Sequence, residues 1–397
     1  MKPAGRIDVQ AWMNDAPTQR LFASLAAAGI VARFVGGCVR NAVLERAIDD
    51  IDLAVDKPPE IVVRALEAAK IKAIPTGIKH GTVTAIADHR TFELTTLRRD
   101  VETDGRRAVV AFTDDWLADA ERRDFTFNAL YADPDGTLYD PFDGRADLAN
   151  GKVRFIGDAD TRIAEDRLRV LRFFRFHAWY GKSPFDGPSL EACRRNSGAL
   201  GALSGERVAK ELFKLLRAPA AADAIEAMFD AGALSRWLPE YAGSKRLRAL
   251  IEREEEPDAL RRLAAVLPAN VDATAIGKRL KLSTQEALRL GVMLEAGPAV
   301  GANPRAEIYR LGTTLFVDRL LLSAPDNWRA ALKLAREWTP PELPVSGADA
   351  LKLGLKPGPK VGELLEAVEG WWIAGDFAAD RAACLAELER LSRKLSS

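Results

Sequence analysis

Residues 36–55 read GGCVRNAVLERAIDDIDLAV, and this stretch decides the fold. Short apolar runs at 33–37 (RFVGG) and 51–55 (IDLAV) lie at its two ends and predict two strands. Gly36 and Gly37 follow the first strand and precede a predicted helix. Such a turn lets backbone N–H groups approach phosphates, with the helix N-terminus behind them. The alternative is a turn that only connects the two elements.

Two aspartates near the end of this stretch indicate a metal site. Asp50 and Asp52 are two residues apart, so on a strand their side chains point to the same face. Two carboxylates repel each other unless a cation lies between them, and Mg²⁺ prefers carboxylate oxygens together with substrate phosphates. Arg40 would add a bidentate phosphate contact. The alternative, an exposed acidic end of a strand, is disfavoured by the glycine pair thirteen residues upstream.

Two further segments supply candidate side chains for the same site. Glu93, in the predicted strand 91–97 (TFELTTL), is a candidate third carboxylate, and a surface glutamate is the alternative. In the segment ERRDFTFNALY, Arg123 would hold triphosphate or ribose, and Asp124 would accept a hydrogen bond from a ribose hydroxyl. A helix N-terminus with ordinary caps is the alternative for this segment.

Strand and helix signals are mixed over the first 150 residues, and helix signals dominate afterwards. The β-branched runs 81–87 (GTVTAIA) and 91–97 predict a hairpin, and 58–70 (PPEIVVRALEAAK) predicts a helix with proline at its start. From about residue 160 the sequence is rich in Ala, Leu, Arg and Glu. We therefore predict an α+β fold, with a mixed sheet and helices over 1–150 and an all-α remainder.

Composition and charge disfavour several classes of protein. The 397 residues carry 57 Lys and Arg against 57 Asp and Glu, and a net charge of zero is not typical of a general nucleic-acid binder. Cys38, Cys193 and Cys384 are odd in number and far apart, which favours a reducing cytoplasm over a disulfide framework or a zinc finger. The three histidines form no paired metal motif. No apolar run of eighteen residues and no secretion signal occurs, so we expect no membrane span and no export.

Residues 165–176 (EDRLRVLRFFRF) predict one helix with two different stripes. Apolar residues recur at spacings of three and four, which is typical of a buried face. The second stripe consists of Asp166, Arg169, Arg172 and Arg175. A solvated, salt-bridged face is one interpretation of these charges. A face that binds a phosphorylated ligand is the other, since 151–217 holds fourteen Lys and Arg against eight Asp and Glu.

Together these motifs resemble those of the class II tRNA nucleotidyltransferases, the CCA-adding enzymes, and of the related bacterial poly(A) polymerases. VGGCVRN with DDIDLAV is similar to the family's metal motif, and RRDFTFNAL is similar to its ribose-selecting motif. YDPFDGRADL at 139–148 is similar to the hinge motif, and EDRLRVLRFFRF to the base-recognition motif. SGERVAKELFKLL at 204–216 is similar to the neck motif, so the five motifs occur in the family's order. TGIKHGTVTA at 76–85 is also similar to the family. Asn41 departs from the pattern, because the family usually has Asp there.

The resemblance implies an enzyme of three parts. A polymerase-beta-like nucleotidyltransferase head at 1–150 would be followed by a helical neck at 151–220 with base recognition, and by a helical body and tail at 221–397 that bind tRNA. The implied reaction adds C, C and A to tRNA 3′ ends from CTP and ATP and releases pyrophosphate. It uses Mg²⁺ in a two-metal mechanism, in which two ions serve an in-line displacement at phosphorus. The implied partner is the acceptor end of tRNA, and no membrane is involved.

The resemblance also implies roles for individual side chains. Asp50 and Asp52 would hold the metal, with Glu93 as a further catalytic carboxylate. The implied nucleotide-binding residues are Gly36, Gly37, Arg40, Arg123, Asp124, Asp166, Arg169 and Arg172, and the implied neck motif contains Glu206 and Arg207. Asp166 would accept from the exocyclic amine that cytosine and adenine share, while Arg169 would donate to ring acceptors beside it. We expect Arg172 to reach phosphate or to support Arg169, and Arg175 to form a salt bridge.

Four other functions remain as alternatives. A poly(A) polymerase shares the motifs, but the net charge of zero and the absence of a long basic extension favour a tRNA-specific enzyme. Segment 98–116 looks like the flexible loop of CCA-adding enzymes, which disfavours a CC-adding member. The intact pair Asp50 and Asp52 argues against a silent RNA-binding module. The long helical remainder argues against a nucleotidyltransferase that acts on small molecules.

Overall fold

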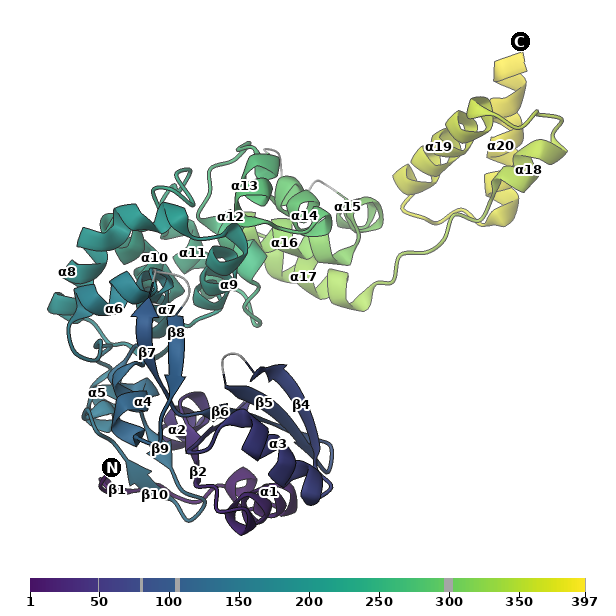
Figure 1. The fold of residues 1–397 in the computed structure, drawn as a ribbon. Coiled ribbons are helices and arrows are strands. Elements are labelled where there is room, and N and C mark those ends of the chain that lie inside the picture. The colour runs from purple at the N-terminus through teal and green to yellow at the C-terminus, as the bar shows by residue number, and fades with distance from the viewer. Residues whose placement is uncertain (49, 79–80, 104–107, 296–302, 397) are drawn as a thin grey trace. The chain divides into compact units, whose positions relative to one another are not determined.

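The computed structural model describes residues 1–48, 50–78, 81–103, 108–295 and 303–396 (Figure 1). Within these ranges the chain forms two compact units, Met1–Tyr241 with Arg279–Lys281, and Ala242–Lys278 with Leu282–Ser397. The first unit contains the sheets, and the second unit is helical. The finer division at residues 150 and 220 stays a prediction.

A mixed sheet forms the centre of the first unit. Among the residues that the structure describes, its strands follow the order β1-β10-β9-β2-β3-β6-β5-β4. β3 and β6 are parallel, and the other neighbours are antiparallel, as predicted for a mixed sheet. These strands are β1 (Gly5–Arg6), β2 (Ala32–Val35), β3 (Ile51–Val55), β4 (Lys72–Gly77), β5 (Thr82–Ala87), β6 (Arg90–Thr96), β9 (Tyr131–Ala132) and β10 (Thr137–Tyr139).

The short apolar runs of the sequence form the strands expected of them. The runs at 33–37 and 51–55 correspond to β2 and β3, and the predicted hairpin corresponds to β5 and β6. Alternate residues of β5 are buried, which is the pattern of a strand with one covered face. The helix predicted at 58–70 is α3 (Pro59–Ala68), with proline in its first turn.

Segment 98–116 contains a second, two-stranded sheet where we expected a loop. β7 (Arg98–Thr103) pairs antiparallel with β8 (Ala108–Phe112), and residues 104–107 lie outside the described part. The sequence of β8 (AVVAF) is apolar and contains two valines, residues that favour extended backbone.

Helices occupy the rest of the described chain. In the first unit they are α1 (Ala16–Ala27), α2 (Gly37–Val43), α4 (Trp116–Glu121), α5 (Gly144–Asn150), α6 (Ala159–Glu165), α7 (Leu168–Tyr180), α8 (Gly187–Asn196), α9 (Gly205–Leu216) and α10 (Ala221–Asp230), besides α3. Short 3₁₀ turns are η1 (Ala11–Met13), η3 (Thr126–Asn128) and η4 (Ser197–Ala202). Then follow α11 (Lys245–Ile251), α12 (Ala259–Ala265), α13 (Ala273–Leu280), α14 (Thr284–Leu294), α15 (Pro304–Leu311), α16 (Thr313–Ser323), α17 (Trp328–Glu337), α18 (Gly347–Lys352), α19 (Pro359–Ala374) and α20 (Arg381–Ser396).

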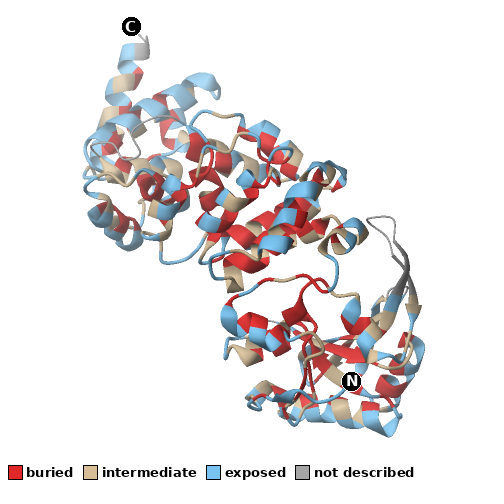
Figure 2. Cartoon of the chain, turned by 90° about the vertical axis from the view of Figure 1, so that its left-hand side faces the viewer, coloured by how far each residue is buried: buried red, intermediate tan, exposed pale blue. Residues whose placement is uncertain are grey.

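An aromatic cluster anchors α7 within the first unit. The ring of Phe125 lies 4.8 Å from that of Phe155 and 5.3 Å from that of Phe176. Phe173 and Phe174 are completely buried, so the predicted apolar stripe is confirmed. Figure 2 shows that buried residues, in red, and exposed residues, in pale blue, occur along the same helices. Full burial of one such side chain stabilises the fold by roughly 1.5–3 kcal/mol, so this stripe fixes the orientation of the opposite, polar face of α7.

The helix predicted over 165–176 is interrupted near its start, which corrects the prediction. α6 ends at Glu165, Asp166 has extended backbone, and α7 begins at Leu168. The carboxylate of Asp166 accepts a hydrogen bond from the N–H of Leu168 at 3.1 Å. Short Asp side chains compete with the helical pattern in this way, because they bond to nearby backbone groups. Asp166 therefore precedes the helix that carries Arg169, Arg172 and Arg175.

A buried ion network joins three helices of the second unit. Asp318 on α16 is fully buried, and it accepts from Arg261 on α12 and from Arg289 on α14 at 2.7–2.9 Å.

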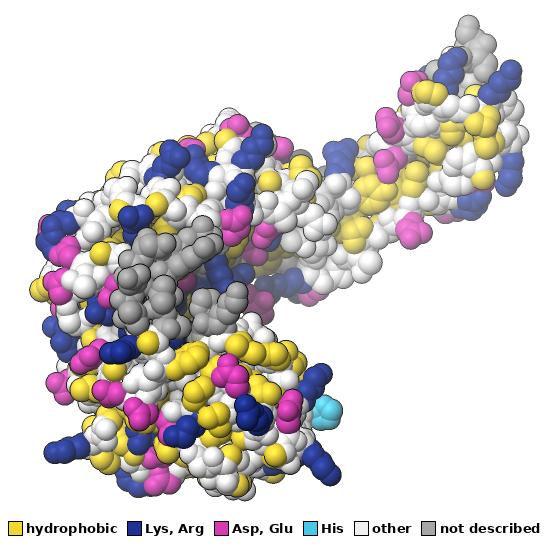
Figure 3. Space-filling model, viewed as in Figure 1, with side chains coloured by type: hydrophobic (Ala, Val, Ile, Leu, Met, Phe, Trp, Pro, Cys, Tyr) yellow, Lys and Arg dark blue, Asp and Glu magenta, His cyan; other side chains and the backbone are white. Residues whose placement is uncertain are grey.

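No helix in the described residues is long and apolar enough to cross a membrane. On the face drawn in Figure 3, Lys and Arg side chains are interspersed with Asp and Glu, in keeping with the net charge of zero.

Candidate active site

A cavity of about 570 Å³ in the first unit collects most of the residues predicted for the site. Its lining residues are Gly36, Gly37, Arg40, Asp52, Arg98, Arg122, Arg123, Asp124, Asn128, Asp166, Leu168, Arg169, Arg172, Arg175, Phe176 and Arg207. Eight of these are arginines and three are aspartates. Such an excess of guanidinium groups suits a ligand with several negative charges, because arginine matches phosphate oxygens in a bidentate manner.

The glycine pair forms a tight turn between β2 and α2, at one wall of the cavity. Gly36 has φ +69° and ψ −119°, a conformation that strongly favours glycine. Its N–H donates to the carbonyl of Leu130 at 3.2 Å, so this amide is not available to a phosphate, contrary to our expectation for Gly36. The N–H groups in the first turn of α2 have no acceptor within the helix and remain candidates.

Arg40 lies on α2 behind this turn and is buried. It donates to the Asn128 side chain at 2.6 Å and to Asn41 at 3.3 Å, and it lies 4.4 Å over the ring of Tyr180. Its Nε is buried and has no hydrogen-bond partner in the described part of the chain. Asn41 therefore helps to hold Arg40 through its amide oxygen.

The three predicted catalytic carboxylates are only partly gathered. Asp52 on β3 and Glu93 on β6 are register partners in adjacent parallel strands, whereas Asp50 is exposed just before β3. Burial, followed by the Glu93 and Asp50 carboxylates, raises the pKa of Asp52 to about 6. Among the described residues, no group of three or more His, Cys, Asp or Glu forms a ready set of metal ligands. The protein thus offers paired acidic oxygens that suit a cation with further ligands from a substrate.

Asp124, in the segment 121–131, forms a polar centre with Arg172 of α7. Asp124 accepts from Arg172 Nε at 2.6 Å, from Asn128 Nδ2 at 2.9 Å and from the N–H of Phe125 at 3.0 Å. Burial alone would raise the pKa of Asp124, but Arg172 and then Asn128 lower it to about 2. The carboxylate of Asp124 is therefore ionised and fixed in place. Arg172 supports this carboxylate, where we expected it to support Arg169.

Asp166 is bound to the neck motif. Arg207 on α9 contacts both of its carboxylate oxygens, at 2.9 and 2.8 Å. Both residues line the cavity, and so does Leu168. The N–H of Leu168 also donates a hydrogen bond to Asp166. Glu206 precedes Arg207 in the first turn of α9 and is absent from the lining residues.

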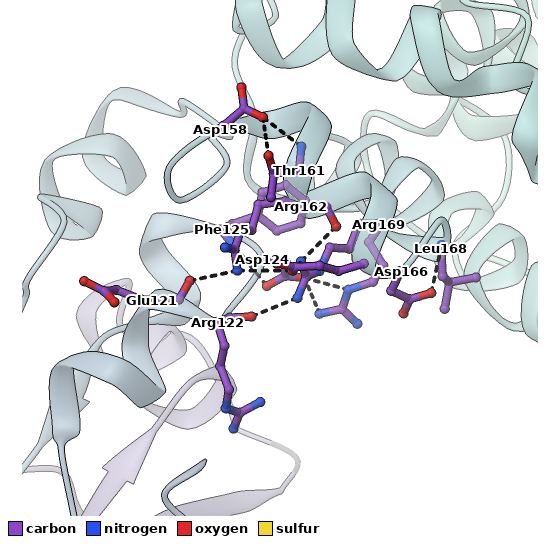
Figure 4. Close-up of polar contacts among 12 residues, drawn as sticks. Glu121, Arg122, Asp124, Phe125, Asp158, Thr161, Arg162, Asp166, Leu168 and Arg169 are labelled. Carbon is purple, nitrogen blue, oxygen red and sulfur yellow. Dashed lines mark hydrogen bonds and ion pairs between the residues drawn. The ribbon is translucent and has the colours of Figure 1, made fainter. Parts of the chain in front are cut away.

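Arg169 is held by backbone oxygens from both sides of the cavity (Figure 4). It donates to the carbonyl of Arg162 at 2.9 Å and to the carbonyl of Arg122 at 2.8 Å. It also forms an ion pair with Glu165, which Arg162 shares at 3.1 Å. Arg162 in turn donates to the carbonyl of Glu121 at 3.1 Å, so this part of the neck is bonded to the ribose-selecting segment.

Two results concern the ends of the polar stripe and its surroundings. Arg175 forms an ion pair with the buried Glu211 of α9, which confirms the expected salt bridge. Asp119 was not predicted as a site residue, yet this buried carboxylate binds Arg122 and Arg123 of the cavity wall. The spacing of Asp119 three and four residues before the two arginines was the available signal, since helical neighbours lie at those distances.

The mixed sheet and the arginine-lined cavity define a nucleotidyltransferase with a polymerase-beta-like head, and comparison with known proteins agrees. Two family models match: the poly A polymerase head domain over 32–154, and the probable RNA and SrmB-binding site of polymerase A over 185–244. The chain is 35% identical to CCA tRNA nucleotidyltransferase 1, mitochondrial, of Danio rerio, across 90% of this chain and 87% of that protein. It is 32% identical to the CCA-adding enzyme of Streptococcus sanguinis, across 92% and 94% of the two chains.

A solved structure gives the same result for the fold. The Bacillus stearothermophilus CCA-adding enzyme, solved in complex with CTP, superposes with a TM-score of 0.79 at 29% identity, covering 96% of this chain and 99% of that one. The chain belongs to the family of CCA tRNA nucleotidyltransferases.

Proposed function

We propose that the protein adds C, C and A to the 3′ end of tRNA, using CTP and ATP and releasing pyrophosphate. One observation carries this proposal: a single cavity brings the aspartate of the metal motif, the ribose-selecting segment and the base-recognition residues together. The names of the Danio rerio and Streptococcus sanguinis relatives support the same activity. Each nucleotide would be joined to the terminal ribose hydroxyl of the RNA.

Different side chains of the cavity bind the triphosphate, the ribose and the base of the nucleotide. The arginines, Arg40 and Arg123 among them, hold the triphosphate, since their guanidinium groups line the same space as the glycine turn. Asp124 accepts from a ribose hydroxyl. Asp166 accepts from the exocyclic amine of cytosine or adenine, and Arg169 donates to the ring acceptors next to it. Uracil and guanine present the opposite groups at these edges, so they would form neither bond with Asp166 and Arg169.

Asp50 and Asp52 are the residues that would hold Mg²⁺, and Glu93 would support them. The carboxylates of Asp52 and Glu93 fit a divalent ion, because burial and then the Glu93 carboxylate raise the pKa of Asp52 and make its ionisation less favourable until a cation is present. When bound, the metal supplies charge neutralisation for the attacking hydroxyl and the leaving pyrophosphate. The chain itself orients the nucleotide and keeps Asp124 ionised at neutral pH.

The α-helical remainder would hold the RNA. We infer a head at 1–150, a neck at 151–220 that contains Glu206 and Arg207, and a body and tail at 221–397 that contact the tRNA acceptor arm. Recognition there would rest on shape and on backbone contacts, as in most binding of double-stranded RNA. We expect a cytoplasmic location, because all three cysteines are free and buried, although the Danio rerio relative is named as mitochondrial.

Product sequencing tests this function against poly(A) polymerase, which the name of the matching head-domain model keeps as the second candidate. The protein is incubated with tRNA that ends before CCA and, separately, with a generic RNA, with each nucleotide alone and in mixture. Addition of CCA to the tRNA alone supports the proposal. Long A tails on generic RNA would establish the polymerase instead, and an absence of pyrophosphate release would indicate a silent RNA-binding module.

A further inference from the structure

Asp119 lies behind the cavity wall and binds two of the arginines that form it. This carboxylate, on α4, is 1% exposed. It accepts from Arg122 Nε at 2.8 Å and forms an ion pair with Arg122 Nη2 at 2.7 Å. It also accepts from Arg123 Nη2 at 3.0 Å and from the hydroxyl of Tyr131 at 2.8 Å.

Tyr131 completes the arrangement from the sheet side. Its hydroxyl accepts from Arg123 Nε at 3.2 Å while it donates to Asp119, so two edges of the Arg123 guanidinium are bonded. A third bond, from Arg123 Nη1 to the carbonyl of Asn128 at 3.4 Å, fixes the plane of the group. Arg123 also lies next to the glycine turn, since a Cβ on Gly36 would lie 3.6 Å from its Nη1.

The charges explain why such support is needed. Arg122 and Arg123 are consecutive cations within a wall that already holds six other arginines, and like charges repel. Burial works against an ionised Asp119, but Arg123 and then Arg122 hold its pKa well below the ordinary value. Asp119 is therefore a permanent anion under the wall. It binds Nε and Nη2 of Arg122 and so leaves the Nη1 side of that group to the cavity. Arg123 is fixed in one orientation beside the glycine turn.

We propose that Asp119, supported by Tyr131, is a positioning residue for the triphosphate of the incoming nucleotide. It touches no substrate and acts by orienting Arg122 and Arg123; this role rests on the nucleotide-binding function proposed above. Because the triphosphate is common to CTP and ATP, its effect is blind to the base. Asp166 and Arg169, in contrast, contact the part of the nucleotide that differs.

The test measures binding of inorganic tripolyphosphate, CTP and ATP to the full-length protein, together with steady-state incorporation on tRNA. Asp119→Asn keeps the size of the side chain and removes its charge. We expect this variant to bind each of the three ligands about tenfold or more weakly, which is the usual effect of losing a charge-assisted hydrogen bond. The KM values for CTP and ATP should rise by the same factor, and the preference for CTP over UTP should stay unchanged. Tyr131→Phe should weaken binding in the same pattern, to a smaller extent.

Asp147→Asn is the matched control. Asp147 is also buried and also binds an arginine, since it accepts from Arg154 Nε at 3.0 Å, but neither residue lines this cavity. This variant should lose thermal stability and keep its affinity for tripolyphosphate. Equal losses of affinity in Asp147→Asn and Asp119→Asn would assign Asp119 a structural role only and overturn the proposal.

Two further outcomes are decisive. Unchanged tripolyphosphate affinity in Tyr131→Phe and in folded Asp119→Asn overturns the proposal, and so does a loss that affects only one base. Where Asp119→Asn does not fold, Tyr131→Phe decides alone, because it removes only a hydroxyl. A wild-type protein that adds nothing to tRNA contradicts the proposed reaction, whereas the tripolyphosphate titration still decides the role of Asp119.

Discussion

Arg207 binds Asp166 through one nitrogen that lies 2.9 Å and 2.8 Å from the two carboxylate oxygens. The two residues are forty-one positions apart, one between α6 and α7 and the other on α9. Because Asp166 has extended backbone outside both helices, the helical pattern does not fix its side chain, and Arg207 supplies that constraint. The neck motif is thereby linked physically to the base-recognition motif.

Removal of this link should relax the choice of nucleotide. Arg207→Gln keeps a polar side chain but shortens it and removes the charge, so the ion pair is lost and we expect the preference for CTP over UTP to fall by about tenfold. Competition assays on tRNA that lacks CCA measure this ratio. Arg194→Gln, which breaks an exposed pair with Glu191, is the control and should keep the ratio. An unchanged preference in Arg207→Gln would show that Asp166 needs no such support.

Loss of the metal-motif carboxylate should stop incorporation. We expect Asp52→Asn to lower the rate of nucleotide addition by about 100-fold or more, because it removes a negative charge that a divalent ion requires. Chelation by EDTA should stop the wild type, and added Mg²⁺ should restore it. Asp56→Asn, just beyond the other end of β3, serves as the control with near-normal rates. Wild-type turnover in EDTA or in Asp52→Asn would refute the metal site.

The buried network of the second unit should be sensitive to the loss of one charge. Asp318→Asn leaves Arg261 and Arg289 without their shared carboxylate, which typically costs about 3–5 kcal/mol of unfolding free energy. Urea unfolding followed by circular dichroism measures this loss. Glu255→Gln breaks an exposed pair with Arg336 and should have no measurable effect. Equal midpoints for the two variants would mean that the network contributes little.

His177 should make the protein less stable as the pH falls. Burial lowers the pKa of His177 to about 4, against the weaker opposing effect of Asp223 on α10. The unfolded chain therefore takes up the proton near pH 6.5 and the folded chain does so only near pH 4. The contribution of neutral, buried His177 to the unfolding free energy is therefore complete above pH 6.5 and disappears as the pH falls towards 4. The total loss is about 3 kcal/mol.

The measurement compares unfolding free energies between pH 7.5 and 4.5. His177→Gln cannot take up a proton, so its stability should fall less steeply than that of the wild type over this range. His89→Asn, at an exposed position with φ +68°, removes a different histidine and should parallel the wild type. Parallel curves for His177→Gln and the wild type would exclude His177 as the source of the slope.

The sequence predicted those elements whose signals are local. β3 coincides with 51–55, and α3 begins at the predicted proline, because alternation and proline act within a few residues. The interruption at Asp166 was missed, since the apolar spacing continues through it while a side-chain bond to Leu168 ends the helical pattern.

The lining of the cavity was more predictable than the contacts within it. Gly36, Asp52, Asp124 and seven other predicted residues line the cavity, whereas Asp50, Glu93 and Glu206 do not. Which partner each arginine takes was not predictable, because a contact such as Arg169 with the carbonyl of Arg122 depends on packing between segments forty-seven residues apart. Asp119 had a local signal in its spacing from the two arginines, but its burial against Tyr131 depends on the fold.

The ion pairs that hold two arginines of α7, Arg169 with Glu165 and Arg175 with Glu211, are largely buried, so the choice of nucleotide and the affinity for RNA should respond differently to ionic strength. Mobile ions screen exposed charges over a Debye length of about 10 Å at 0.1 M salt, and they reach buried pairs much less. Protein–phosphate contacts along an RNA, in contrast, weaken steeply as salt rises. Added KCl should therefore raise the KM for tRNA well before it changes the ratio of C to U incorporated.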